Sequence, residues 1–316
     1  METLVVLAVV GSFKFLAASW IRLKIKQRFR YFGTVSRINL YPVKGCHATR
    51  VNSAKCGSLG LEVNGVKDRC IMVVDTEAGI GQYLRHYPKM TYINITVGRE
   101  DIVLDAPDMQ SLTLPRTPDT NQAKVICQIH ECKQMTRDFG DKAANWIGRY
   151  LGNDKLRLVY YMENTERRTI ETDKLIREGN PNISPEDKIS FTVASSYLLA
   201  NERTLEELSK VVTEPVKMDN FRPNIVIDGL LPFEEDTWSQ IRIGEDVIFR
   251  CQESCRRCMV TTINPDTAER SKKNEPLKTL KKYKEKVGGV PTSFGVYAAA
   301  ECGGQVRVGD QVYVLN

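Results

Sequence analysis

The chain of 316 residues has only three histidines, and histidine is a side chain on which many enzymes depend. The Gly-x-Gly-x-x-Gly, Walker A, Gly-x-Ser-x-Gly and His-Glu-x-x-His patterns are absent, which disfavours Rossmann, P-loop, α/β-hydrolase and zinc-protease enzymes. Internal repeats and low-complexity segments are absent too. The composition of 42% apolar and 27% charged residues excludes a wholly disordered chain and a polytopic membrane protein.

The net charge of +6 is unevenly spread, because residues 1–61 carry +9 and the other 255 residues carry −3. A mildly acidic body argues against nucleic-acid binding, so no nucleic-acid partner is expected. The basic residues of the leader are Lys14, Arg22, Lys24, Lys26, Arg28, Arg30, Arg37, Lys44, Arg50 and Lys55.

An apolar run from Leu4 to Ile21 contains one charge, Lys14, and a basic cluster follows it. As a helix, these 18 residues would cover about 27 Å, close to the thickness of a bilayer core. The basic flank predicts that residues 1–30 are a signal anchor and that the body stays in the cytosol. An interfacial amphipathic helix and a cleaved signal peptide are the alternatives. A short anchor of this kind suits the mitochondrial outer membrane, with the endoplasmic reticulum or peroxisomal membrane as alternatives.

The body alternates short apolar runs with turn residues, which predicts many strands and few helices. Such a pattern favours barrels or sandwiches over a doubly wound sheet. The polar stretch 163–188 is expected to be a loop or boundary between residues 31–162 and 189–316. Strands are expected at 33–41, 69–75, 156–161, 225–227, 240–243, 260–263 and 311–315, and helices at 143–151, 195–211 and 276–286.

Three of the nine cysteines form a C-x3-C-x2-C motif, Cys251, Cys255 and Cys258. Enzymes with a [4Fe–4S] cluster use this spacing. A zinc site would need a further ligand. The third alternative is that two of the cysteines are core residues and the other is an exposed thiol. Arg256 and Arg257 precede Cys258, and positive charge favours the thiolate. A thiolate among guanidinium groups suits a soft metal whose cofactor also carries a phosphate.

Other polar groups stand at the ends of expected strands and could meet an anion. Lys44 and Gly45 follow one strand, Asp68-Arg69 precedes a second, and Asn220-Phe-Arg222-Pro-Asn224 precedes a third. Taken alone, each of these also fits an ordinary polar turn.

Taken in order, Tyr41-Pro-Val-Lys44, Asp68-Arg69, Asn220-Phe-Arg-Pro-Asn224 and Cys255-Arg-Arg-Cys258 resemble the MOSC proteins, the sulfurase carboxy-terminal superfamily. The resemblance covers about Gly33 to Leu315. With the predicted anchor, it is closest to the membrane-anchored, amidoxime-reducing branch. It implies a strand-rich α+β fold in which a MOSC N-terminal β-barrel region packs with a MOSC-domain β-barrel, after one N-terminal anchor helix.

The resemblance also implies a molybdenum–molybdopterin cofactor with Cys258 as the metal ligand and catalytic residue. The residues that it places around the pterin and its phosphate are Lys44, Gly45, Arg69, Ser195, Arg222, Asn224, Arg256 and Arg257. Members of the family have Ser at the positions of Gly45 and Arg256, and Thr at that of Ala194. Side-chain hydroxyl bonds are therefore absent at these three positions, although backbone amides could serve.

The implied activity is the reduction of small N-hydroxylated compounds (amidoximes, hydroxylamines and N-oxides), with nitrite reduction to nitric oxide as a further candidate. Electrons would come from a b-type cytochrome served by an NADH-dependent flavin reductase. Basic residues near the C-terminus could dock an acidic cytochrome, namely Lys272, Lys273, Lys278, Lys281, Lys282 and Lys284. The alternatives are a cofactor-binding or sulfur-carrier module without turnover, and an iron–sulfur protein.

Overall fold

The computed structural model describes residues 29–129, 132–163, 180, 182–184 and 186–315. The predicted anchor, 4–21, lies outside the described residues, as does most of the predicted loop 163–188. Across the described part of the chain, every helix is too short or too polar to cross a membrane. The predicted strand-rich fold with β-barrels and few helices is confirmed.

The larger sheet has eight strands in the order β15-β14-β18-β17-β16-β20-β1-β2. A further antiparallel pairing of β1 with β15 closes seven of these strands into a ring, while β2 pairs only with β1. The strands are β1 (Arg30–Leu40), β2 (Thr49–Val51), β14 (Tyr197–Asn201), β15 (Ile225–Gly229), β16 (Gln240–Ile243), β17 (Val247–Arg256), β18 (Ser293–Cys302) and β20 (Gln311–Leu315). The first described strand thus completes a barrel whose other strands follow residue 196.

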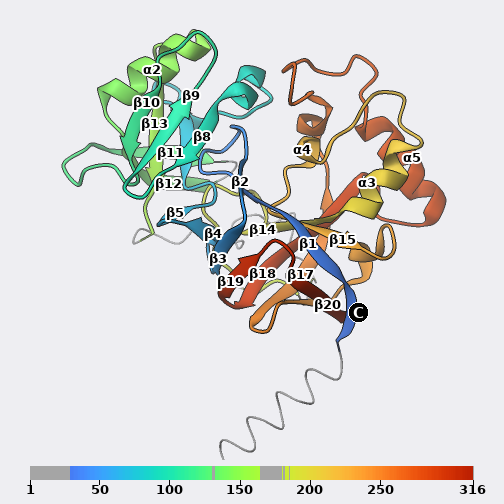
Figure 1. Ribbon diagram of the computed structural model, residues 1–316. Helices are drawn as coiled ribbons and strands as arrows, with labels where there is room; N and C mark the ends of the chain where they lie inside the picture. Colours follow the sequence, from blue (N-terminus) through green and yellow to red (C-terminus); the bar gives the residue numbers. More distant parts are fainter. Residues whose placement is uncertain (1–28, 130–131, 164–179, 181, 185, 316) are drawn as a thin grey trace, which may run out of the picture.

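The second group of strands is a closed barrel with the order β11-β12-β13-β6-β7, flanked by two smaller sheets. Its strands are β6 (Ile71–Asp75), β7 (Ile80–Gly81), β11 (Lys124–Ile129), β12 (Cys132–Asp138) and β13 (Leu156–Tyr161). One small sheet holds β8 (Asn94–Val97), β9 (Asp101–Asp105) and β10 (Leu112–Pro115). The other holds β3 (Ser53–Gly57), β4 (Gly60–Val63), β5 (Val66–Lys67) and β19 (Gly304–Arg307). Figure 1 shows the two barrels side by side.

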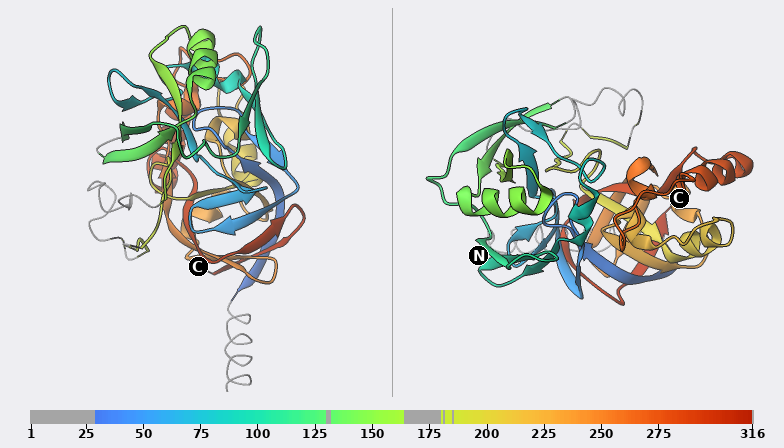
Figure 2. Two further views of the ribbon diagram at one scale, coloured as in Figure 1. Left: turned by 90° about the vertical axis from the view of Figure 1, so that its left-hand side faces the viewer. Right: turned by 90° about the horizontal axis from the view of Figure 1, so that it is seen from above.

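The α-helices are α2 (Asp141–Leu151), α3 (Glu202–Ser209), α4 (Met218–Phe221) and α5 (Leu277–Val287), and the 3-10 helices are η1 (Pro88–Tyr92), η3 (Glu234–Thr237) and η4 (Met259–Thr262). Helix α2 covers the second barrel, whereas α3, α4 and α5 lie on the opposite side of the molecule (Figures 1 and 2). The expected helices 143–151 and 276–286 are confirmed by α2 and α5. The expected helix 195–211 is wrong in its first half, because residues 197–201 form a fully buried strand. The expected strand 260–263 is largely the 3-10 helix η4.

One apolar core runs through both barrels, since a single cluster of buried residues joins Phe32 and Phe249 of the larger barrel to Leu158 of the smaller. The backbones of β1 and β15 approach closely. The Phe32 ring of β1 occupies the space that a side chain at Gly229 of β15 would fill. The Phe32 ring also packs edge-on against Trp238, with ring centroids 4.9 Å apart. The shared core places the residues at the strand ends of both barrels in one fixed frame.

A buried carboxyl group in η3 makes stability depend on pH. Thr204 donates to one Glu235 oxygen at 2.9 Å, while the other oxygen is buried and has no hydrogen-bond partner among the described residues. Burial raises the pKa of Glu235 from its ordinary value of 4.5 to about 7. Below pH 4.5 the group is neutral in both states, so its cost to stability develops between pH 4.5 and 7.

We therefore expect the wild-type protein to lose roughly 3 kcal/mol of unfolding free energy, relative to Glu235→Gln, as pH rises from 4.5 to 8. Urea unfolding of both proteins across this range measures the difference. If the unfolding free energies of the two proteins changed in parallel with pH, the pKa of Glu235 would be the same in the folded and unfolded states, contrary to this prediction.

Candidate functional site

A cavity of about 380 Å³ opens between the two barrels and is lined by residues from both. All nine residues singled out from the sequence line it, although they come from five separate parts of the chain. They are Lys44, Gly45, Arg69, Ser195, Arg222, Asn224, Arg256, Arg257 and Cys258.

Two arginines lie against one buried aromatic ring in the wall of the cavity. The guanidinium carbons of Arg69 and Arg222 lie 4.5 and 4.4 Å from the centre of the Tyr41 ring. Both arginines adopt a left-handed backbone conformation, with φ of 49° and 54°. Burial lowers the pKa of Arg222 and raises that of Tyr41 to about 12, so at neutral pH the tyrosine is uncharged beneath two cations.

A buried hydrogen-bond network holds these two arginines in place. Arg69 donates to its neighbour Asp68, to Asn224 Oδ1 at 3.2 Å and to the Arg222 carbonyl at 3.1 Å. Asp68 is fully buried and also accepts from the Tyr41 backbone amide at 2.9 Å. Arg222 donates to the Cys46 carbonyl at 2.6 Å. The network pre-orders the cations, so that little side-chain entropy remains to be lost when an anion binds.

Lys44 and Ser195 both line the cavity, and both donate to backbone carbonyls. Lys44 Nζ donates to the Phe191 carbonyl at 2.7 Å and lies 4.9 Å from the centre of the Tyr83 ring. The Ser195 hydroxyl donates to the Ala298 carbonyl at 2.6 Å. The ammonium group thus stands at the cavity wall, whereas the Ser195 hydrogen is used within the fold.

Gly45 holds a backbone conformation that disfavours other residues, with φ of +93°, and a Cβ there would lie 2.9 Å from the Met90 methyl carbon. We expect Gly45→Ala to lower the unfolding free energy by about 2–3 kcal/mol, through strain and crowding together. Gly79→Ala is the matched control, because Gly79 has φ of +67° but nothing within 4 Å. Its cost should be limited to about 1 kcal/mol. If chemical denaturation gave equal losses of unfolding free energy for the two variants, crowding by Met90 would be excluded as a cause.

The three cysteines of the C-x3-C-x2-C motif do not converge on one point. Cys251 and Cys255 are buried on β17, while Cys258 follows the strand and is exposed. Within the described residues, no three His, Cys, Asp or Glu side chains gather as metal ligands. The arrangement argues against the iron–sulfur alternative, because Cys251 lies in the apolar core while Cys255 is buried in the cavity wall and bonded by Arg257. Of the two described cysteines that line the cavity, Cys255 and Cys258, Cys258 is the exposed one.

Arg257 lies beside that thiol and is nearly enclosed by protein. It donates to Cys255 Sγ at 2.7 Å and to the Phe221 carbonyl at 2.6 Å. Its Nε is buried and has no hydrogen-bond partner among the described residues. Leaving a buried guanidinium N–H without an acceptor costs free energy. Its presence here fits a site in which a bound ligand supplies the acceptor.

Several residues of the cavity were not found from the sequence, because they belong to no motif. Tyr83, Leu84 and Arg85 come from the loop after β7, and Phe191 comes from the stretch before β14. The dipeptide Arg85-His86 in a turn-rich stretch was the one available signal. Among the described lining residues there are six Lys or Arg side chains and no Asp or Glu, so the cavity is strongly positive.

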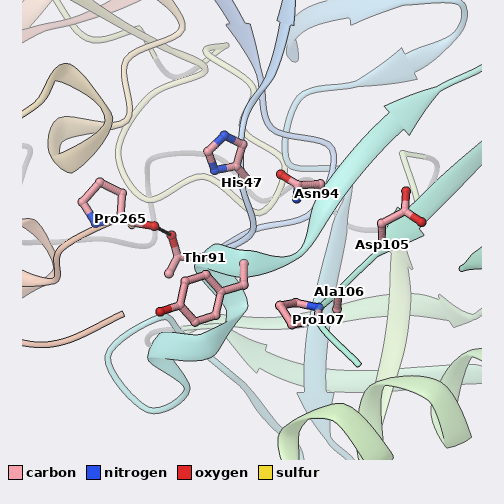
Figure 3. A pocket seen from close by; sticks show the side chains of 8 residues that line it. His47, Thr91, Asn94, Asp105, Ala106, Pro107 and Pro265 are labelled. Carbon is pink, nitrogen blue, oxygen red and sulfur yellow. Dashed lines mark hydrogen bonds between the residues drawn. The ribbon is translucent and has the colours of Figure 1, made fainter. Parts of the chain in front are cut away.

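A second hollow, of about 330 Å³, lies against His47, Asn94 and Asp105 (Figure 3). One side of it is closed by a hydrogen bond from the Thr91 hydroxyl to the Pro265 carbonyl at 2.9 Å. None of the nine residues singled out from the sequence lines it.

Comparisons with known proteins agree with the arrangement of both barrels. The MOSC N-terminal beta barrel domain matches residues 32–154, and the MOSC domain matches residues 186–313. Mitochondrial amidoxime-reducing component 1 of Homo sapiens is 35% identical over 311 residues, covering 95% of this chain and 89% of that protein. Its counterpart in Mus musculus is 33% identical over 297 residues, covering 92% and 85%. Mitochondrial amidoxime reducing component 2 of Rattus norvegicus is 35% identical over 309 residues, covering 93% and 88%. This chain therefore belongs to the MOSC family, together with the mitochondrial amidoxime-reducing components.

Proposed function

We propose that this chain is a molybdenum cofactor-dependent reductase of N-hydroxylated compounds. The observation that carries the proposal is the exposed thiol of Cys258 in a cavity whose described lining residues include six cations and no Asp or Glu. A lone thiolate suits a metal that brings its other ligands with its cofactor, and clustered guanidinium groups suit the phosphate of that cofactor.

The residues present fit such a group. Cys258 would hold molybdenum, while Lys44, Arg69, Arg222, Arg256 and Arg257 would surround the phosphate and pterin. Gly45, Ser195 and Asn224 would complete the binding wall. The buried Arg257 Nε, which lacks an acceptor among the described residues, is a donor that the bound group would satisfy. The cofactor supplies two-electron redox chemistry, while the protein supplies orientation and charge.

The reaction would break the N–O bond of an amidoxime, hydroxylamine or N-oxide. Two electrons and two protons are consumed, the oxygen leaves as water, and the nitrogen compound is released in reduced form. Nitrite, reduced to nitric oxide by one electron, is a further candidate substrate. The electrons would come singly from a b-type cytochrome and its NADH-dependent flavin reductase.

The surface proposed for the acidic cytochrome lies on and before α5 and comprises Lys272, Lys273, Lys278, Lys281 and Lys282, all exposed. Lys284 was expected to belong to this surface, but it is buried and paired with Asp236. The prediction for Lys284 is thus wrong, because the helix turns this residue toward the barrel. The remaining lysines still form a positive face.

We further propose the mitochondrial outer membrane as the location, with residues 1–30 as the anchor and flank, and with the body facing the cytosol. The names of the relatives and the basic leader of this chain support this location. The endoplasmic reticulum and the peroxisomal membrane are the alternatives. The proposed division of the body is an N-terminal region, 31–162, a connecting stretch, 163–188, and a MOSC domain, 189–316.

The test combines metal content with turnover. The purified full chain should contain close to one molybdenum per chain and should reduce benzamidoxime to benzamidine with dithionite as the electron source. Molybdenum without turnover would favour a cofactor-binding or sulfur-carrier module instead. Absence of both molybdenum and turnover, in protein made by cells that synthesise the cofactor, would overturn the proposal.

A further inference from the structure

One cation of the cavity, Arg85, has no part in the proposed cofactor contacts. It is exposed on the loop after β7, and it lines the same cavity as Cys258. Its neighbours in the lining include the apolar side chains of Leu84, Val193 and Met259. The mouth of the cavity thus offers a charged group beside an apolar surface.

The positive charge of the cavity exceeds what the proposed cofactor would neutralise. A phosphate monoester carries about two negative charges at neutral pH, and a Cys258 thiolate would add one. Asp68 compensates Arg69, with which it is paired. These four negative charges leave about two of the six cations without compensation. Arg85 and Arg256 are the exposed ones, so the surplus lies at the mouth.

Local contacts fix the place of Arg85. Its guanidinium carbon lies 5.1 Å from the centre of the Tyr83 ring, and its Nε donates to His86 Nε2 at 3.1 Å. Partial burial and, after it, the charge of Arg85 hold the pKa of His86 below its usual value, so that ring remains a neutral acceptor. A guanidinium held in this way can bind a carboxylate with little loss of rotamer freedom.

We propose that Arg85 binds an anionic group of the substrate, and that this chain prefers N-hydroxylated compounds that carry a carboxylate. This inference rests on the proposed function and adds a substrate class to it. Guanidinium–carboxylate pairs are the strongest hydrogen-bonded pairs available to an exposed arginine, and the nearby apolar side chains would contact the body of the substrate.

The experiment compares benzamidoxime with 4-carboxybenzamidoxime on the cofactor-loaded full chain, with dithionite as reductant. In the wild type, the carboxylate compound should have a KM about tenfold lower, and the difference should shrink at high salt. In Arg85→Gln, the ratio of the two KM values should approach one. Lys89→Gln is the matched control, since Lys89 is an exposed cation of the adjoining turn that does not line the cavity. It should keep the wild-type ratio.

A binding measurement separates recognition from turnover. Benzoate should bind the loaded wild-type protein with a Kd about tenfold lower than that of benzamide, and Arg85→Gln should abolish this difference. If both oximes are reduced with equal KM in wild type and Arg85→Gln, the inference is overturned and the proposed function stands. If neither oxime is reduced, the proposed function fails, and the substrate class fails with it.

Discussion

Cys258→Ala is expected to remove molybdenum and to lower the rate of benzamidoxime reduction by roughly a hundredfold or more. Losses of tenfold to a hundredfold follow from removing partners of a metal ligand alone, so losing the ligand itself should cost at least as much. Because the Cys258 side chain is exposed, the unfolding free energy of the cofactor-free variant should differ from that of cofactor-free wild type by no more than about 0.5 kcal/mol, whereas loaded wild type gains further stability from the bound group. Elemental analysis, turnover and thermal unfolding of the same preparation measure all three effects.

Cys302→Ala is the control for Cys258→Ala, because Cys302 is also an exposed free thiol but lies at the end of β18, outside the cavity. It should keep molybdenum and activity at the wild-type level. Equal molybdenum content and equal reductase activity in wild type and Cys258→Ala would sink the assignment of Cys258 as the metal ligand.

The second large effect is expected in stability, at a lysine that the fold has buried. Lys284 Nζ pairs with Asp236 and lies 4.2 Å from the centre of the Phe233 ring, and the side chain is 1% exposed. Removing the lysine leaves the Asp236 carboxylate, which is 19% exposed and accepts from Ser254 at 2.9 Å, without its cation. Lys284→Ala should therefore lower the unfolding free energy by about 3 kcal/mol, the low end of the range for a buried pair. Urea unfolding measures the loss.

Two further variants test the physical reason for that loss. Lys282→Ala, on the exposed face of the same helix, should change the unfolding free energy by no more than about 0.5 kcal/mol. Replacing both partners, with Lys284→Met and Asp236→Asn, should recover more than half of the loss, because no unpaired charge remains. A loss below about 1 kcal/mol in Lys284→Ala would show that water reaches the Asp236 carboxylate.

Nine of the described cavity residues were predicted from the family resemblance, and most of these nine stand at strand ends. Lys44 follows β1, Asn224 precedes β15, and Cys258 follows β17, so closing the barrels brings the three together. Short motifs at such positions can be recognised in the sequence without any knowledge of the strand order. Their proximity is seen in the structure, whereas their roles are still predictions.

The stretch 195–211 shows where local pattern was insufficient. Leu198 and Leu199 fit the apolar side of a helix equally well, yet residues 197–201 form β14, which is buried on both faces and paired with β15 and β18. A run buried on both faces has no period to distinguish strand from helix. Likewise, Arg85 could not be placed, because its loop reaches the cavity only through contacts between the two barrels.

The pairing of β1 with β20 has a consequence for how the protein is made. Arg30 lies opposite Val314, so the first residues of β1, 30–34, have no β20 partner until almost the whole body has been synthesised, although β2 and β15 pair with the rest of β1 earlier. At translation rates of about 5–20 residues per second, that interval is roughly 15–60 s. During this time the growing chain exposes an unpaired strand edge, which can pair with other chains. A chaperone bound at the ribosome would prevent such association. The barrel that carries Cys258 can therefore close only after β20 has been synthesised, because β20 joins β16 to β1 in its ring of strands.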